Sequence, residues 1–323
     1  NPKLRPNVVF GSYCVFSQRD PQSVISKQPE ESVIDLMTCA ESLNIAHYAQ
    51  NTIHDGKRGV LEKNKINDRR KAVFCVNAFL AYALKISQRY GDEITAVALH
   101  LNDQVLRSFT PEMVMQVERE KYLYDDKAFN ASFYDILSRE GVGGFFANCI
   151  RLGYLASGRR ENETLLRGLE DVFVDFGIAL EELNALGDFI LPRTKVLTHE
   201  KDSSDQLADL RGGVITPPIR MIYARGNQTD IKLLDKIYTE GSNTLDEHKE
   251  VLRMLFETGT YQEIATKLKS KSRHLRGRIK KLGIPDTSRW FLQCLTSILD
   301  SNRLYRNFME DWNEVRHQIT TAY

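Results

Sequence analysis

The 323-residue sequence lacks several features that would place it in a broad functional class. Its net charge is +1, so no excess of positive charge favours binding to nucleic acid or to an anionic membrane surface. No run approaches 18 apolar residues, which excludes a transmembrane helix. The first residues, Asn-Pro-Lys-Leu-Arg-Pro, contain neither a signal peptide nor an initiator Met. We therefore expect a cytoplasmic protein whose N-terminus is trimmed.

Cysteines and strand patterns are also scarce. The alternation of Val, Ile and Thr between turn residues that marks strands is missing. The cysteines are scattered, odd in number and without the spacing of metal ligands, and they are Cys14, Cys39, Cys75, Cys149 and Cys294. Because each lies in an apolar run, we expect buried free thiols rather than disulfides.

Apolar residues recur every three to four positions through most of the chain, which predicts helices. Residues 32–49 have one apolar face, and residues 71–87 are apolar on most sides and predict a buried central helix. Further helices are expected at 92–107, 111–123, 131–157, 162–190, 230–238, 244–257 and 288–318. No repeat or long linker interrupts them. The pattern predicts one all-α helical bundle over residues 1–323, with basic helices across 260–323.

Five short motifs follow one another between residues 3 and 218. They are Lys3-Leu4-Arg5-Pro6, Lys57-Arg58-Gly59, the stretch from Tyr134 to Gly153, Gly177-Ile178-Ala179-Leu180, and Asp209-Leu210-Arg211 with Thr216 and Pro218. In this order they resemble the trans-isoprenyl diphosphate synthase (polyprenyl synthetase) family. The resemblance implies a single-domain helical bundle of the isoprenoid synthase type.

The resemblance also implies a chemistry. In that family, carboxylates from two facing helices hold several Mg²⁺ ions on an allylic diphosphate, while Lys and Arg neutralise the leaving group. The positions that match would make a prenyl diphosphate the ligand of Lys3, Arg5, Lys57, Arg58 and Arg211.

The charged positions of the family pattern are largely missing from this chain. His54-Asp55 runs through one glycine into Lys57, so the first metal motif keeps only Asp55. In the second motif, Glu181 replaces the family's Gln. The Asp-Asp-x-x-Asp of the family is replaced by Asn184-Ala185-Leu186-Gly187-Asp188. The family's Lys-Thr pair is Gly141-Val142, and its later Gly-Lys pair is Gly213-Val214.

Two interpretations follow from this pattern. The first is a degenerate synthase-like protein that serves as a non-catalytic or regulatory subunit in isoprenoid biosynthesis, as a homodimer or in a heterodimer with an active synthase subunit. The alternative is a repurposed terpene cyclase-like or prenyl-transferring enzyme, in which Asp55, Glu181, Asn184 and Asp188 hold one Mg²⁺. Its catalytic candidates are Asp55, His54 and Glu181. Neither interpretation expects the family's standard Mg²⁺-dependent prenyl transfer.

A third interpretation rests on residues 267–281, which contain eight Lys or Arg and no acid. With the flanking residues this segment mimics a helix-turn-helix DNA reader, which predicts a DNA-binding or scaffold protein. The family resemblance instead implies an ordinary surface helix here, so nucleic acid is not the expected partner. Asp125-Asp126 is expected to cap a helix rather than to bind a metal.

Overall fold

The computed structural model describes residues 4–26, 30–54, 69–158, 162–189, 207–241, 244–300, 305–306, 308–313 and 316. Every regular element in these residues is a helix, which confirms the all-α prediction. The elements are α1 (Leu4–Ser17), α2 (Pro21–Ser26), α3 (Glu31–His54), α5 (Arg69–Ser87), η1 (Gln88–Tyr90), α6 (Asp92–Val117), α7 (Arg119–Tyr124), α8 (Asp126–Phe129), the π-helix η2 (Asn130–Gly143), α9 (Gly144–Ala156), α10 (Glu163–Gly187), α11 (Ala208–Gly212), α12 (Pro217–Arg225), α13 (Gln228–Glu240), α14 (Leu245–Glu257), α15 (Thr260–Lys281), α16 (Asp286–Thr296) and η4 (Ser297–Asp300).

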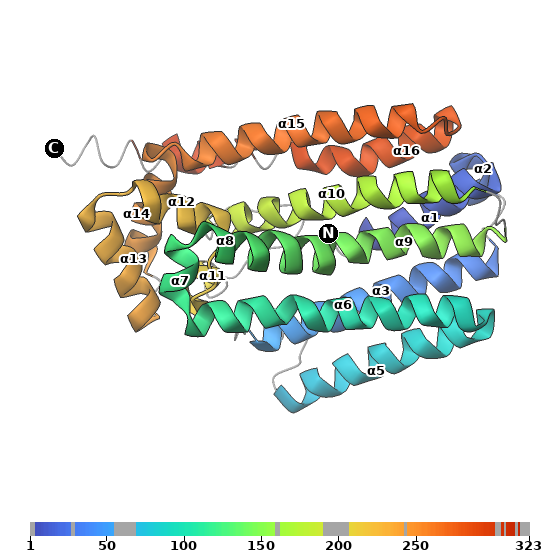
Figure 1. Cartoon of the computed structure of the whole chain (residues 1–323), viewed down its shortest axis with the longest axis horizontal. Helices are drawn as coiled ribbons and strands as arrows, with labels where there is room; N and C mark the ends of the chain where they lie inside the picture. Colours follow the sequence, from blue (N-terminus) through green and yellow to red (C-terminus); the bar gives the residue numbers. More distant parts are fainter. Residues whose placement is uncertain are drawn as a thin grey trace.

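The long helices lie side by side as a bundle (Figure 1). The middle of the bundle contains α1, α9 and α10; α3 and α6 lie on one side of it, with α5 outside them, and α15 and α16 lie on the other side. One continuous hydrophobic core reaches from α1 to Phe308. The shorter helices α7 and α11 to α14 gather at one end, which is also where α3 and α10 terminate (Figure 1). Within the described residues, none of the helices is both long and apolar enough to span a membrane.

Local sequence explains where several helices begin. The Asn162 side chain accepts a hydrogen bond from the Leu165 N–H at 3.2 Å and so caps α10. Asn227 and Thr244 each form a reciprocal capping box with the acidic residue three positions later, at the starts of α13 and α14. The Asp125 carboxylate accepts the N–H groups of Lys127 and Ala128, which confirms that it caps a helix.

The prediction of a buried central helix at 71–87 is wrong. α5 forms an edge of the bundle, where it packs on α3 and, less extensively, on α6 (Figure 1). Its buried positions are Ala72, Val76, Ala83 and Ile86, while several apolar side chains on its other side are exposed. Composition alone could not separate these two faces, because both are apolar.

Two smaller expectations also fail, and one helix was not expected. α6 continues through Pro111, so residues 92–117 form one helix rather than two. Sequence periodicity does not predict α1, because α1 is buried around nearly its whole circumference and shows no polar face. Cys294 is exposed on α16 and Cys75 is only part-buried, although Cys14, Cys39 and Cys149 are the buried free thiols expected.

Candidate functional site

The candidate site lies at the end of the bundle where α3 and α10 terminate (Figure 1). Glu181 and Asn184 of the second motif lie on the C-terminal half of α10, and α3 ends at His54, the residue before Asp55 of the first motif. Part of the predicted site cannot be placed, because Lys3, Asp55, Lys57 and Arg58 and the side chain of His54 lie outside the described residues. The roles assigned to those residues stay predictions. The remaining candidates are Arg5, Glu181, Asn184, Asp188 and Arg211.

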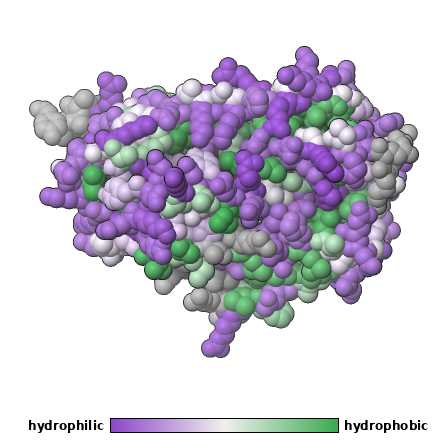
Figure 2. All heavy atoms as spheres, in the orientation of Figure 1, coloured by the Kyte–Doolittle hydropathy of each residue, from purple (hydrophilic) through white to green (hydrophobic). Residues whose placement is uncertain are grey.

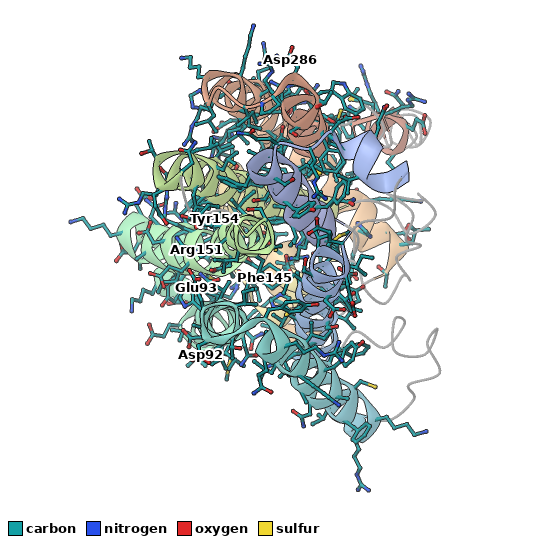
Figure 3. The ribbon with its side chains drawn as sticks, turned by 90° about the vertical axis from the view of Figure 1, so that its right-hand side faces the viewer. Asp92, Glu93, Phe145, Arg151, Tyr154 and Asp286 are labelled. Carbon is teal, nitrogen blue, oxygen red and sulfur yellow. The ribbon has the colours of Figure 1, made fainter. Side chains whose placement is uncertain are left out.

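Arg5 extends from α1 onto two aromatic rings of α9. Its guanidinium carbon lies 4.8 Å from the ring centre of Phe145 and 5.3 Å from that of Phe146. Both rings are buried, and Figure 3 shows Phe145 in the interior of the bundle. Burial lowers the pKa of the Arg5 guanidinium, and the nearby Cys149, Glu41 and Glu181 oppose that shift. Arg5 thus lies over two aromatic rings in a largely apolar setting.

His47 on α3 belongs to the same environment. Burial, followed by the positive charge of Arg5, lowers the pKa of His47 to about 3. The imidazole is therefore neutral at physiological pH. A neutral histidine beside a buried arginine adds no positive charge for binding a diphosphate.

The second-motif positions on α10 have different surroundings. Glu181 is part-buried and interacts electrostatically with Arg5, whereas Asn184 is exposed. Asp188 is buried at the end of α10, where its Oδ2 accepts the Asp209 N–H at 3.3 Å. The Asp188 carboxylate therefore helps to attach α11 to α10.

The attachment of α11 also positions Arg211. The Leu207 N–H donates to the Asp188 carbonyl at 3.2 Å, and the Arg211 N–H donates to the Leu207 carbonyl at 2.9 Å. Gly213 ends α11 with φ +76°, and a Cβ at this position would lie 2.6 Å from the Tyr238 ring. The positive φ and the short distance to Tyr238 therefore both favour glycine at this position.

The described residues do not by themselves form a metal site. Among them, no three His, Cys, Asp or Glu side chains are arranged to hold a metal ion. Glu181, Asn184 and Asp188 would need Asp55, which lies outside the described residues, and Asp188 already accepts a backbone hydrogen bond. The four-residue Mg²⁺ site stays a prediction.

α10 and η2 touch through their backbones beside the missing Lys-Thr pair. A Cβ on Gly177 would lie 2.6 Å from the Gly143 Cα, and a Cβ on Gly143 would lie 2.8 Å from the Val174 carbonyl oxygen. The adjoining Gly141 and Val142 carry no charge. The backbones of α10 and η2 therefore pack closely here, and the residues at the two Lys-Thr positions supply no cation.

Sequence reasoning missed a buried polar pair between α6 and α9. The Asn148 amide donates to Gln104 Oε1 at 2.8 Å and to the Gly144 carbonyl at 3.0 Å. Both side chains are buried. A signal was present, since Gln104 falls in phase with the buried Ile94, Val97 and Leu101 of the same helix.

The basic segment 267–281 forms most of α15, which packs along α10. Several of its cations are paired within the protein. Lys267 and Lys271 bind Glu182, Arg276 binds Asp300, and Arg278 binds Asp175. Glu182, which the sequence did not single out, is the carboxylate that both lysines share.

Comparisons with known proteins show the fold. No protein-family model matches the sequence, and no curated protein matches it. A polyprenyl synthase from Caulobacter crescentus, solved with calcium and isoprenyl diphosphate, is 15% identical and has a TM-score of 0.72, with 94% of this chain and 85% of that chain covered. A heptaprenyl diphosphate synthase from Staphylococcus aureus is 16% identical with a TM-score of 0.70 and coverages of 93% and 87%.

A third solved structure agrees with these two. A geranylgeranyl pyrophosphate synthase from Corynebacterium glutamicum, complexed with isoprenyl diphosphate and magnesium, is 17% identical with a TM-score of 0.64 and coverages of 93% and 86%. The chain therefore has the fold of these synthases over nearly its whole length. The resemblance drawn from the sequence motifs is confirmed at the level of the fold.

Proposed function

We propose that this chain, which shares its fold with trans-isoprenyl diphosphate synthases, is a non-catalytic or regulatory subunit in isoprenoid biosynthesis. One observation carries the proposal: the helices that frame the interior are present, while the charged positions on them are replaced. Gly141 and Val142 stand where the synthase pattern has Lys and Thr, and Asn184 stands where it has Asp. A protein that no longer handles a diphosphate with metals can lose those charges and keep its scaffold.

The surroundings of Arg5 support this proposal. A diphosphate that bound Arg5 would have to draw its guanidinium away from the rings of Phe145 and Phe146. His47 beside it is neutral. Metal-assisted diphosphate ionisation requires dense positive charge at the leaving group. The described part of the interior is poorly equipped to supply it.

The surface supports a role as a subunit. We define the α5–α6 face by its exposed apolar side chains, which are Val73, Phe74 and Tyr82 on α5 and Leu99, Leu106, Met113 and Val117 on α6. Leu99, Leu106 and Met113 recur every seven residues and so share one side of α6. Figure 2 shows apolar atoms gathered over the edge where these helices lie.

Exposed apolar patches of this kind mark protein–protein interfaces. The family resemblance implies dimers, and the α5–α6 face gives the second subunit a place to bind. In this arrangement the chain would stabilise an active synthase subunit or shape its product tunnel. The face would then be buried in the dimer.

The proposal is tested by mixing the purified chain with each active prenyl diphosphate synthase of its source organism. We expect one of them to co-sediment with the chain as a stoichiometric dimer and to change its product length or its thermal stability. The Phe74→Glu variant should lose both effects. Unchanged products and no complex with any of these synthases would contradict the subunit role.

A further inference from the structure

A second candidate site is a pocket between η2, α10 and α15. Its volume is about 390 Å³, within the range of small-molecule sites. Asp175 and Ile178 of α10 line it, about two turns and one turn before Glu182. Glu181, the predicted metal ligand, lies about 100° around the helix from Glu182. Neither Glu181 nor any other residue of the site that the synthase pattern predicts lines this pocket, so the two sites are separate.

Basic side chains from two helices converge on this pocket. Lys267, Lys271 and His274 of α15 stand at i, i+4 and i+7 and so share one side of that helix, and Arg139 approaches from η2. Lys267 Nζ lies 2.6 Å from Glu182 Oε1, and Lys271 Nζ lies 3.1 Å from Glu182 Oε2. Both ammonium groups thus form ion pairs with one buried carboxylate.

The remaining charges leave the pocket positive. Asp175 is bound by Arg278, and Asp135 is the other lining carboxylate. The side chains of Arg139 and His274 have no hydrogen bond or ion pair with any described residue, although both line the pocket. Because Arg278 pairs with Asp175, the three cations Arg139, Lys267 and Lys271 face two carboxylates, Asp135 and Glu182.

The floor of the pocket is apolar and aromatic. Leu275 and Ile178 are buried, and the Tyr134 ring lines the pocket with them, its hydroxyl 3.3 Å from Lys267 Nζ. Lys267 also lies 5.1 Å from the centre of the Tyr134 ring. A ligand with an anionic head and a flat or aliphatic body matches this combination of rim and floor.

We propose that this pocket binds a small organic phosphate. Arg139, Lys267 and Lys271 would hold the phosphate oxygens, because guanidinium and ammonium groups form short charge-assisted hydrogen bonds to phosphate. The body of the ligand would rest on Tyr134, Ile178 and Leu275. The phosphate would compete with Glu182 for the two lysines. The site does not depend on the proposed subunit role.

The test is calorimetric titration of the full-length protein with phenyl phosphate and with inorganic phosphate, in the absence of metal. We expect one site that binds phenyl phosphate more tightly than inorganic phosphate, since only the former reaches the apolar floor. Arg139→Ala should weaken binding about tenfold or more. Glu182→Gln should tighten it by releasing both lysines.

Two control variants give the test its specificity. Lys280→Ala removes an exposed cation from the same helix outside the pocket and should leave the affinity unchanged. Arg211→Ala alters the predicted diphosphate site and should also leave it unchanged. Equal binding by Arg139→Ala and the parent protein would overturn the proposal, as would loss of binding in Arg211→Ala alone. Absence of phenyl phosphate binding would overturn it as well.

Discussion

His47 shows how burial sets the charge of a single residue in this protein. The fold lowers its pKa from the usual 6.5 to about 3, so the unfolded chain binds a proton between these values and the folded chain does not. The contribution of His47 to stability is therefore complete above pH 6.5 and is lost as the pH falls from 6.5 toward 3. The slope is about 1.4 kcal/mol per pH unit.

Urea denaturation between pH 6.5 and 5.5 checks this expectation. The parent protein should lose about 1 kcal/mol more free energy of unfolding over this interval than the His47→Gln variant does. His274→Gln, which changes an exposed histidine on α15, is the matched control and should keep the slope of the parent protein. Equal slopes for His47→Gln and the parent would show that His47 is not held neutral.

Two helical glycines with opposite surroundings provide a second test at this scale. Gly177→Ala should reduce the free energy of unfolding by about 1–3 kcal/mol, because its Cβ would overlap the Gly143 backbone. Gly277→Ala on α15 meets no atom within 4 Å and should raise stability by about 0.5–1 kcal/mol. Thermal denaturation of both variants measures the difference. A free energy of unfolding unchanged by Gly177→Ala would contradict the close crossing of α10 and η2.

At the scale of helices, the outer side of α5 matters most for the proposed function. Phe74 is 74% exposed, and a charge at this position should disrupt the α5–α6 face without disturbing the core. If the purified chain self-associates through this face, Phe74→Glu should raise the dimer dissociation constant about tenfold or more. Analytical ultracentrifugation over a concentration series measures it.

The matched control for this experiment is Trp290→Glu on α16. Trp290 is 63% exposed and is also aromatic, but its helix α16 lies on the opposite side of the bundle from α5. Its replacement should leave the sedimentation behaviour of the parent protein unchanged. An equal effect of both substitutions would mean that the association is non-specific, and no effect of Phe74→Glu would place the interface elsewhere.

Helix positions were predictable where one side of a helix is polar. The periodicity at 32–49 and 162–190 corresponds to α3 and α10, and the acidic residue three positions after Asn227 or Thr244 marks a helix start. Periodicity did not predict α1, which apolar residues surround, and it predicted α5 as a helix without showing that one apolar side of it faces solvent. A sequence does not state whether an apolar side chain meets the core or a second subunit.

For the whole molecule, motif order predicted the fold better than it predicted the site. The order of short motifs survives because it reflects the packing of helices, as the contact of Gly177 with Gly143 illustrates. The placement of Arg5 on Phe145 and Phe146, and the sharing of Glu182 by two lysines, depend on contacts between distant segments. No local pattern specifies such contacts.

We propose that the chain keeps the synthase fold without its metal-dependent prenyl transfer. The most direct test is a turnover assay of the purified, folded chain with Mg²⁺, labelled isopentenyl diphosphate and allylic diphosphates of increasing length. We expect no labelled longer product. Products that disappear in Glu181→Ala and Asp188→Ala would contradict the claim and would identify a rebuilt metal site on α10.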